Sequence, residues 1–418
     1  MKTNTETKFK QTEIGKIPYD WEVVRLGDVV SYFLGRTPAR KELKYWSQKN
    51  EGIPWVSISD MKPFSIITDT EKKLTKDAVK IMPQISRKGT LIMSFKLTVG
   101  RTSILGIDAY HNEAIISIYP RENILKEFLL YYLPKVNYSI LQDRAVKGQT
   151  LNKSKIDNIL VIVPPLEEQK KIAGVLSKIQ EAIENQRKII EKLEELKKST
   201  MDKLFKNGLY GKETKQTEIG EIPYDWEVVR LGDVCDTTSG GTPYRNISKY
   251  FGGNIPWVKS GELKDYDILD TEEKISEEGL KNSSAKILEK GTLLVAMYGA
   301  TVGKTGILGI KAATNQAICA ILPKNSKTVF NKFIQYFLIK NRNFLIRERY
   351  GGAQPNISQQ VIKNLSIPLP PLEEQKKIAE ILSKIDNMKE EAEKKLDYLN
   401  EFFNSALDLL ITGKVRLN

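Results

Sequence analysis

The decapeptide PPLEEQKKIA occurs twice in the chain, at Pro164–Ala173 and again at Pro370–Ala379. Each copy opens a run of roughly 40 residues that has neither a Gly-Pro break nor an aromatic-rich core pattern. Proline stands just before each run and glycine just after it, at Gly208 and Gly413, as capping chemistry favours at the two ends of a helix. The sequence therefore predicts two long helices.

Apolar residues in both runs recur at alternating steps of four and three, which is the 3.5-residue period of a coiled-coil seam. In the first run, which extends to about Phe205, the seam positions are Ile172, Leu176, Ile179, Ile183, Gln186, Ile190 and Leu193. In the second, which extends to about Thr412, they are Ile378, Leu382, Ile385, Ala392, Leu396, Leu399, Phe403, Ala406 and Leu410, with Lys389 at the one missed position. A single helix about 60 Å long would leave this seam in water. We therefore expect the two helices to pair with each other.

The repeat extends beyond the helices. Lys10–Val29 recurs at Lys215–Val234 with one change, Lys16 to Glu221, and shorter landmarks follow in the same order in both halves. These landmarks are Ile53–Val56 and Ile255–Val258, Lys88–Leu91 and Lys290–Leu293, Val99–Thr102 and Val302–Thr305, and Asn112–Ile115 and Asn315–Ile318. The tail at 411–414 also resembles 209–212, the linker into the second copy. This pattern predicts a cyclic arrangement with pseudo-two-fold symmetry and antiparallel helices.

Short runs of β-branched and aromatic residues, mixed with helical pieces at 126–133 and 331–339, predict an α/β fold for each copy. The expected strands of the first copy are 21–26, 53–58, 90–95, 114–119 and 159–163. We expect four parts: a first domain at 1–165, a helix at 166–206, a second domain at 207–371, and a helix with its tail at 372–418. The frame is shared but the stretches between landmarks differ, which suits two related tasks on two ligands.

The net charge of +13 lies on the globular parts. Residues 1–165 carry +9 and residues 206–371 carry +5, whereas the helical runs carry +1 and −4. Excess positive charge on folded domains indicates a polyanionic partner, although a generally basic protein would show it too. Two cysteines are too few for a metal cluster, and no apolar stretch reaches the length of a membrane span. We expect a soluble, cytoplasmic protein with no membrane association.

Catalytic signatures are missing from the sequence. The one histidine, His111, has no matching base, and the second copy has Thr314 in its place. The stretch Tyr298–Thr305 resembles a phosphate-binding P-loop but has three residues between its glycines where that motif needs four. No glycine-rich cofactor motif or repeated acidic cluster of the nuclease type is present. The sequence favours a binding protein without cofactor or metal over a P-loop NTPase.

Basic and aromatic residues alternate in the divergent stretches and again just before each helix, the residue types that read bases and meet phosphates. Arg pairs with guanine and Asn or Gln with adenine, whereas Lys mostly meets phosphate. In the first copy the candidate DNA-binding residues are Arg36, Arg40, Lys41, Lys44, Lys49, Arg101, Lys147, Gln149 and Lys153. In the second they are Tyr244, Arg245, Lys249, Tyr250, Lys304, Arg347, Arg349, Gln354 and Asn356. The tryptophans of the two Ile-Pro-Trp segments could also stack on bases, but a single Trp after Pro in a strand is more often a core residue.

Four features together closely resemble the specificity subunit of type I restriction–modification enzymes. They are the duplicated opening IPYDWEVVRLGDV, the run Gly-Gly-Thr-Pro…Ile-Pro-Trp-Val, the run Gly-x3-Gly-Lys…Asn-Gln-Ala-Ile, and the helix start PPLEEQKKI. The resemblance covers essentially the whole chain. The first copy departs from the pattern, with Phe33–Arg36 in place of Gly-Gly and Asn112-Glu113 in place of Asn-Gln.

The resemblance implies a non-catalytic subunit with two target recognition domains joined by conserved spacer helices. Such a subunit binds double-stranded DNA, two modification subunits that methylate adenine with S-adenosylmethionine, and two restriction subunits in the full complex. We expect each domain to read one half of a bipartite target and the helices to set the spacing. The alternative is a free-standing coiled-coil DNA-binding regulator without enzyme partners.

Overall fold

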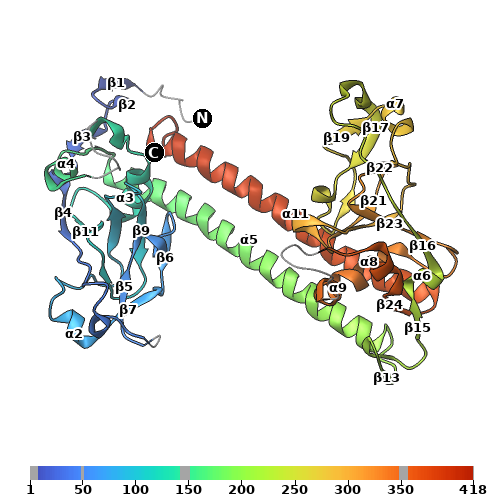
Figure 1. The fold of residues 1–418 in the computed structure, drawn as a ribbon. Helices are drawn as coiled ribbons and strands as arrows, with labels where there is room; N and C mark the ends of the chain where they lie inside the picture. Colours follow the sequence, from blue (N-terminus) through green and yellow to red (C-terminus); the bar gives the residue numbers. More distant parts are fainter. Residues whose placement is uncertain (1–7, 49–50, 142–150, 348–355, 418) are drawn as a thin grey trace, which may run out of the picture. The chain divides into compact units, whose positions relative to one another are not determined.

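The computed structural model describes residues 8–48, 51–141, 151–347 and 356–417. It divides into two compact units, each with one α/β domain and the adjoining parts of both long helices (Figure 1). Unit 1 comprises Met1–Gln186 and Lys395–Asn418, and unit 2 comprises Arg187–Lys394.

The domain of unit 1 is built on a five-stranded sheet in the order β4-β11-β8-β9-β6, in which only β6 and β9 pair in parallel. A three-stranded sheet, β10-β5-β7, and the pairs β1-β2 and β12-β3 complete it. The strands are β1 Phe9–Thr12, β2 Gly15–Pro18, β3 Glu22–Arg25, β4 Val30–Leu34, β5 Ile53–Val56, β6 Ser65–Ile67, β7 Lys72–Leu74, β8 Leu91–Ser94, β9 Thr102–Leu105, β10 Tyr110–His111, β11 Ile115–Pro120 and β12 Leu160–Val163. The short helices are α1 Leu26–Val29, α2 Lys76–Val79, α3 Lys126–Tyr132 and α4 Lys153–Asp157, with 3-10 turns η1 Leu43–Tyr45, η2 Ile58–Asp60, η3 Leu133–Lys135 and η4 Tyr138–Leu141.

The domain of unit 2 repeats this topology, with sheets β16-β23-β20-β21-β18 and β19-β17-β22 and the pairs β13-β14 and β15-β24. Its strands are β13 Thr214–Thr217, β14 Gly220–Pro223, β15 Glu227–Arg230, β16 Cys235–Ser239, β17 Phe251–Val258, β18 Asp267–Ile268, β19 Glu273–Ile275, β20 Leu293–Ala296, β21 Thr305–Leu308, β22 Ala313–Thr314, β23 Ile318–Pro323 and β24 Ser366–Leu369. Its helical pieces are α6 Leu231–Val234, α7 Glu277–Lys281, α8 Asn331–Lys340, α9 Arg342–Arg347, α10 Gln359–Asn364, η5 Ser248–Tyr250, η6 Ser260–Glu262 and η7 Gly299–Thr301.

The two long helices are α5, Leu166–Asn207, and α11, Leu372–Ile411. In unit 2 the ion pair Lys389–Glu194 spans 2.5 Å and Lys197–Asp386 spans 2.5 Å, so rising numbers on α5 meet falling numbers on α11. The expected antiparallel pairing and the α/β fold are therefore confirmed.

The seam residues pack as the 3.5-residue period predicts. Ile172, Leu176, Ile179 and Ile183 of α5 lie in the core of unit 1 with Phe403 of α11. Leu407 is also buried there, although the period did not select it, because the chain nears the end of the helix and packs on the domain. In unit 2, Leu193, Ile385 and Ala392 form their own small core.

The structure gives a reason for the repetition of PPLEEQ. Glu168 is buried and its Oε2 accepts a 2.8 Å hydrogen bond from Nε1 of Trp21, which is fully buried in the domain. Glu374 and Trp226 repeat the bond at 3.3 Å in unit 2. Each glutamate thus ties the first turn of a long helix to the tryptophan of the duplicated opening.

The neighbouring glutamine forms a second link of the same kind. The Gln169 side chain donates to the carbonyl of Pro164 at 2.8 Å and to that of Asn123 at 3.1 Å, and accepts from the amide of Leu125 at 2.9 Å. Gln375 makes the matching three bonds in unit 2. A buried amide with three partners is costly to replace, so sequence identity here has a structural cause.

Both helices end at a glycine in the left-handed region, Gly208 with φ 64° and Gly413 with φ 67°. A Cβ on Gly413 would lie 2.3 Å from Pro18 Cγ, and one on Gly208 would lie 3.2 Å from Pro223 Cγ. Gly413 is therefore the counterpart of Gly208, and the register expected for the tail, with Gly413 matching Gly211, is wrong by three residues. In unit 1, Arg416 closes the tail onto the first domain through bonds to Glu168 and Asp20.

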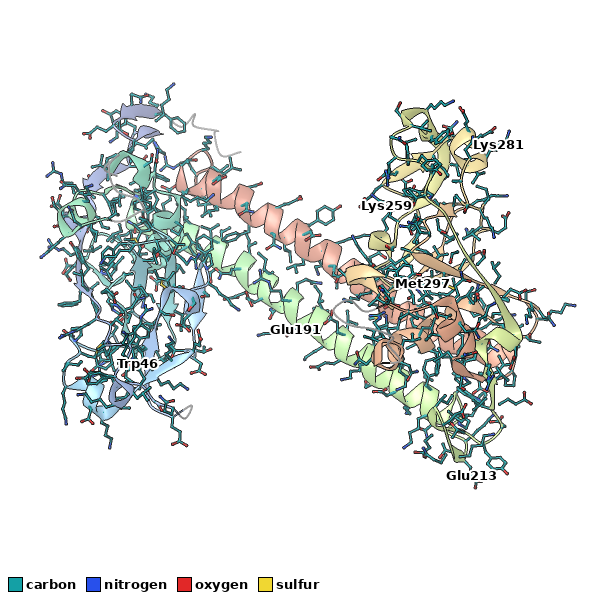
Figure 2. The ribbon with its side chains drawn as sticks, in the orientation of Figure 1. Trp46, Glu191, Glu213, Lys259, Lys281 and Met297 are labelled. Carbon is teal, nitrogen blue, oxygen red and sulfur yellow. The ribbon has the colours of Figure 1, made fainter. Side chains whose placement is uncertain are left out.

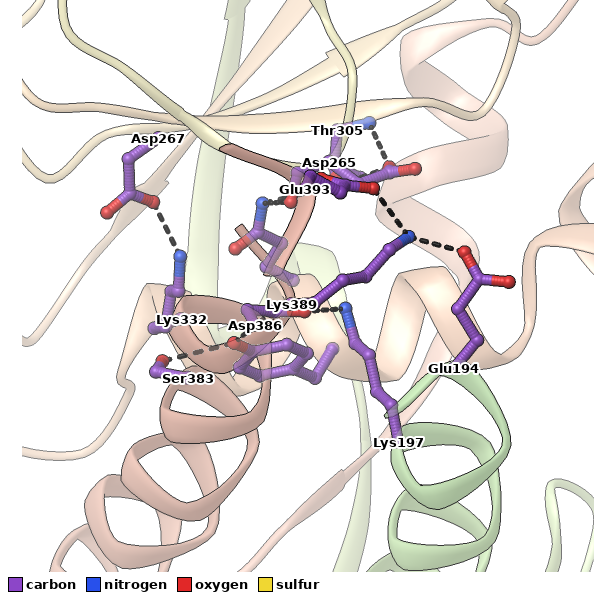
Figure 3. Close-up of polar contacts among 12 residues, drawn as sticks. Glu194, Lys197, Asp265, Asp267, Thr305, Lys332, Ser383, Asp386, Lys389 and Glu393 are labelled. Atoms are coloured by element: carbon purple, nitrogen blue, oxygen red, sulfur yellow. Dashed lines mark hydrogen bonds and ion pairs between the residues drawn. The ribbon is translucent and has the colours of Figure 1, made fainter. Parts of the chain in front are cut away.

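The junction of helix and domain differs in character between the units. In unit 1 it is aromatic: Phe64 contacts the rings of Tyr131 and Phe403 with centroids 5.5 and 5.4 Å away. In unit 2 the counterpart of Phe64 is Asp265, which accepts hydrogen bonds from the amide and hydroxyl of Thr305. Figure 3 shows this polar junction, which also contains the ion pairs of Lys197, Lys332 and Lys389.

Candidate nucleic-acid interface

Four segments of unit 1 meet at the end of the five-stranded sheet where β8 turns into β9. The loop after β4 is joined to the loop after β10 by a hydrogen bond from the Thr37 hydroxyl to the Glu113 carboxylate. The amide of Phe95, at the start of the β8–β9 turn, donates to the carbonyl of Ala114 at 2.9 Å, and the amide of Leu151 donates to the carbonyl of Phe95 at 3.0 Å. The divergent insert, the turn and the segment before α4 therefore lie at one edge.

Unit 2 builds the same edge with different residues. The Thr242 hydroxyl donates to the Gln316 side chain. The amide of Met297 donates to the carbonyl of Ala317 at 2.8 Å, and the amide of Ile357 donates to the carbonyl of Met297 at 2.9 Å. In each unit the start of the divergent insert and a residue just before the short helix α4 or α10, Leu151 or Ile357, are thus brought to a common edge with the turn.

The departures of the first copy from the family pattern do not alter this geometry. Asn112 Oδ1 accepts from the amide of Ala114 at 3.0 Å, as Asn315 Oδ1 accepts from that of Ala317 at 3.2 Å. A Cβ on Gly35 would lie 2.1 Å from the carbonyl oxygen of His111. Gly35 therefore provides the close backbone approach that Gly240 provides in the second copy.

The Ile-Pro-Trp tryptophans are core residues that hold the insert in place. Trp55 is 3% exposed and its Nε1 donates to the carbonyl of Arg36 at 3.1 Å. Trp257 is 1% exposed and its Nε1 donates to the carbonyl of Gly241 at 3.0 Å. Trp46 packs edge-on against Trp55 in the end of the domain that contains β5, β7 and α2 (Figure 2). Buried indoles cannot stack on bases, so they position the loop instead.

The candidate residues of unit 1 are mostly exposed. Arg36 donates to the carbonyl of Ile81 at 2.8 Å and Lys44 pairs with Glu42 at 2.8 Å. Arg101 is half-buried and donates to the carbonyl of Met61 at 3.1 Å. The remaining exposed candidates are Arg40, Lys41 and Lys153. Lys49, Lys147 and Gln149 lie outside the described residues.

Most described cations of unit 2's candidate set have acidic partners. Arg245 stacks over Phe251 at 4.7 Å and pairs with Glu273 at 2.5 Å, and Lys249 pairs with Glu278. Lys304 pairs with Asp265 at 3.1 Å. Tyr250 is buried, whereas Tyr244 and Asn356 are exposed. The side chain of Arg347, and Arg349 and Gln354 entirely, lie outside the described residues.

The stretches that connect β4 to β8 in unit 1 and β16 to β20 in unit 2 differ in net charge as well as in ion pairing. Residues 31–87 contain eleven basic and six acidic residues, whereas the corresponding residues 236–289 contain seven and ten. Lys259 pairs with both Glu272 and Glu273 in the β17 end of unit 2 (Figure 2). The insert of the first domain therefore presents net positive charge, and that of the second presents cations already balanced by carboxylates.

Two residues of the edge were not selected from the sequence. Leu97 at the tip of the β8–β9 turn is 73% exposed, and Tyr298 in the matching turn is 41% exposed. The turn could have been identified as a loop between two apolar strands. The outward direction of these side chains depends on backbone geometry that residue types do not reveal.

The structure gives no catalytic arrangement to His111. The ring is buried, and Nε2 lies 2.6 Å from the Ser117 hydroxyl, which contacts Ser86 in turn. Burial lowers the pKa of His111 to about 4. Burial also raises the pKa of the Cys235 and Cys319 thiols to about 12. The described residues contain no group of three or more His, Cys, Asp or Glu side chains placed to hold a metal ion.

Within the described parts of the chain, no helix is both long enough and apolar enough to cross a lipid bilayer.

The chain matches the type I restriction modification DNA specificity domain twice, over residues 18–195 and 223–400. It is 31% identical to the type I restriction enzyme MjaVIII specificity subunit of Methanocaldococcus jannaschii, over 99% of this chain and 97% of that protein. The crystal structure of the type I restriction–modification S subunit from M. genitalium has a TM-score of 0.59 at 14% identity, covering 98% of each chain. A chain solved in work on complex assembly of the type I system has a TM-score of 0.56 at 20% identity, covering 96% of this chain and 99% of that one. The two structural matches show the shared fold.

Proposed function

Because this chain belongs to the type I restriction–modification DNA specificity family, we propose that each of its domains reads one half of a bipartite target in duplex DNA. The chain is a non-catalytic specificity subunit, and methyl transfer and cleavage belong to partner subunits. In our proposal the paired helices set the spacing of the half-sites and bind two modification subunits, and restriction subunits join the full complex. Residues 1–165 and 207–371 would be the two target recognition domains.

The contrast within the two loop edges carries this proposal. The glutamate and glutamine that join the first turn of each long helix to its domain are the same in both units, as with Glu168 and Glu374, and the backbone bonds from Phe95 and Met297 hold the two loop edges in the same way. The side chains that the loops present differ: one unit has Arg36 and Leu97, whereas the other has Tyr298 and, in place of Arg36, the glycine Gly241. Two domains that share a scaffold but differ in the side chains of their loops are expected to recognise different base sequences.

Continuous helices support the spacing role. Helix α5 runs without a break from the first domain to the second, over 42 residues. Removing one heptad from it, with the facing heptad of α11 to keep the seam in register, shortens the path by about 10 Å. We expect the gap between half-sites to shrink by roughly three base pairs, because one base pair rises about 3.4 Å. The half-site sequences should not change.

A second apolar stripe on each long helix supports the docking role. It occupies the position just before one set of seam residues and repeats every seven residues. In unit 2 it contains Ile189 and Leu196 of α5 and Ile381 and Met388 of α11, each between 37% and 53% exposed. Lys395 interrupts the repeat in α11, and Phe402 and Leu409 resume it in unit 1, where they are 58% and 41% exposed. Apolar side chains in such a repeat fit helices of a protein partner.

The test is a protection assay with the modification subunits of the same host. The assembled complex should protect one bipartite sequence in duplex DNA at moderate salt, and methylome sequencing of cells with and without the gene should give the same sequence. A complex that binds duplexes without regard to sequence would contradict the proposal. Failure of the chain to co-elute with the modification subunit, while it binds DNA selectively alone, would favour a free-standing regulator.

A further inference from the structure

Leu97 has an unusual backbone conformation for its residue type. Among the described residues other than glycine, only Phe64, Leu97 and Asp265 have positive φ, with values of 60°, 65° and 70°. A residue with a Cβ pays roughly 1–2 kcal/mol to adopt this region. Such a conformation persists where the surrounding structure requires it, and it often accompanies a functional site.

Phe64 and Asp265 are explained by their contacts. They are counterparts at the helix junction, where Phe64 stacks with aromatic rings and Asp265 binds Thr305 and Lys304. Leu97 has no such internal role, because its side chain is 73% exposed. In the matching turn of unit 2 the left-handed position is held by Gly299, with φ 78°. The fold itself therefore does not require a leucine here.

The turn that carries Leu97 is firmly held. The amide of Gly100 donates to the carbonyl of Ser94 at 2.8 Å, and the Ser94 hydroxyl donates to the carbonyl of Thr98. Gly100 rests on the ring of Tyr138, where a Cβ would lie 2.3 Å from Cε2. Arg101 ties the far side of the turn to the carbonyl of Met61. Leu97 is thus an apolar side chain on a rigid tip that faces solvent.

Positive charge surrounds this tip. Lys96 precedes Leu97 and Arg101 follows the turn. Lys96 and Arg40 both act on the Glu113 carboxylate and help to lower its pKa against the opposing effect of burial. Lys153 lies exposed at the start of α4, two residues after Leu151, which is bonded to the base of the turn. An apolar tip among cations suits a polyanion with apolar base surfaces, and suits a protein partner less well.

We propose that Leu97 is a specificity-determining residue of the first domain, which packs against the bases of its DNA half-site. Apolar side chains contact thymine methyl groups in the major groove or enter between base steps, whereas lysines and arginines beside them hold the phosphates. Tyr298 and Gly299 occupy the same turn in the second domain, so the two half-sites are read differently here. The inference rests on the proposed function and names a residue that carries it out.

The test uses Leu97→Gly in the complete complex with modification subunits. Glycine adopts positive φ freely, so the thermal midpoint should be equal to or above that of the wild type. Affinity for the cognate duplex should nevertheless fall at least about tenfold, the effect of losing one buried leucine side chain. Discrimination against a duplex with the first half-site scrambled should fall by the same factor, and discrimination at the second half-site should remain. Leu97→Met, which keeps an apolar side chain, should stay within about threefold of the wild type.

Leu269→Ala is the matched control, because Leu269 is 72% exposed and lies outside the loop edge of unit 2 described above. It should leave both affinity and discrimination unchanged. If the Leu97→Gly complex bound the cognate duplex and discriminated between half-sites as well as the wild type does, the inference would be overturned and the proposed function would remain intact. Weaker assembly with the modification subunit, at unchanged DNA affinity of the complex that forms, would overturn it too and assign the tip to a protein contact. Loss of selectivity already in the wild type would contradict the proposed function itself.

Discussion

The indole of Trp21 and the carboxylate of Glu168, 147 residues apart in the chain, are joined by a buried hydrogen bond of 2.8 Å. The same carboxylate accepts from Arg416 at 2.7 and 2.8 Å. Burial alone would raise the pKa of Glu168, but the bonds from Arg416 and Trp21 outweigh it and the pKa lies below its ordinary value. One carboxylate therefore joins the first domain, the start of α5 and the tail.

We expect Glu168→Ala to lower the free energy of unfolding of unit 1 by about 2–4 kcal/mol, because it leaves the buried indole of Trp21 without its acceptor and Arg416 with Asp20 as its one remaining carboxylate partner among the described residues. Glu374→Ala should cost less in unit 2, since the bond from Trp226 is longer, at 3.3 Å, and Lys212 is 3.8 Å away. Urea unfolding followed by amide hydrogen exchange separates the two units.

Glu167→Ala is the control for this pair, because Glu167 is exposed and contacts Lys170 in an ordinary surface ion pair. It should change stability by less than about 0.5 kcal/mol. Equal losses for Glu167→Ala and Glu168→Ala would show that the buried bond contributes little.

The long-range order of this fold could be predicted because it repeats in the sequence. The period of the seam residues, the Pro and Gly at the helix ends and the duplicated opening each reflect a local rule, and both long helices and the five expected strands of the first copy are present, as β3, β5, β8, β11 and β12. The strands β1, β2, β4, β6, β7, β9 and β10 escaped prediction, and three of them belong to the five-stranded sheet. These strands have two to five residues each and depend on pairing across the sheet.

The candidate site was less predictable for a physical reason. Residue type identified Arg245 and Lys249 as cations, but whether they are free to contact phosphate depends on their pairing with Glu273 and Glu278. These glutamates lie 28 and 29 residues away in the sequence. Leu97 was not selected because an apolar residue between two apolar strands is usually a core residue. Its exposure follows from the conformation of the turn. Pairing and exposure are properties of the folded chain.

His111 should make unit 1 more acid-sensitive than unit 2. Burial lowers its pKa to about 4, whereas the unfolded chain has a pKa of about 6.5. The unfolded state therefore binds more protons between pH 6.5 and 4, so stability is complete above this window and falls as pH drops through it. The loss should approach about 3 kcal/mol.

Unit 2 provides the residues with which the acid sensitivity assigned to His111 can be tested. Unit 2 has Thr314 where unit 1 has His111, and Ala320 where unit 1 has Ser117. His111→Thr with Ser117→Ala should flatten the pH dependence of hydrogen exchange in unit 1 between pH 7 and 4.5. An unchanged slope would assign the acid sensitivity to carboxylates instead.

Lys389 should lower the stability of the helix pair in which it lies. It occupies a seam position whose counterpart in α5 is Ile183, and its side chain is 18% exposed in an ion pair with Glu194. Lys389→Ile should raise the free energy of unfolding by about 1–2 kcal/mol, and the thermal midpoint with it, because an apolar side chain is buried in the seam. Glu194, which loses its partner, stays exposed and solvated. Polar seam residues specify register, so the same change should broaden the distribution of oligomers. Lys384→Ile, at an exposed position, should alter neither, and a destabilised Lys389→Ile would show that the ion pair outweighs burial.

The first domain should dominate the salt dependence of DNA binding. Arg40 and Lys41 are exposed and form no ion pair within the described residues, whereas Arg245 and Lys249 are paired with glutamates. Each phosphate contact contributes about 0.9 to the slope of log affinity against log salt, so Arg40→Gln with Lys41→Gln should reduce that slope by about two. Arg245→Gln with Lys249→Gln should reduce it by less than one, because those cations are already neutralised in the folded protein. Titrations of the cognate duplex between 50 and 200 mM salt measure both slopes. A larger change for the second pair would mean that DNA displaces Glu273 and Glu278 from their cations, and that the recognition surface of unit 2 rearranges on binding.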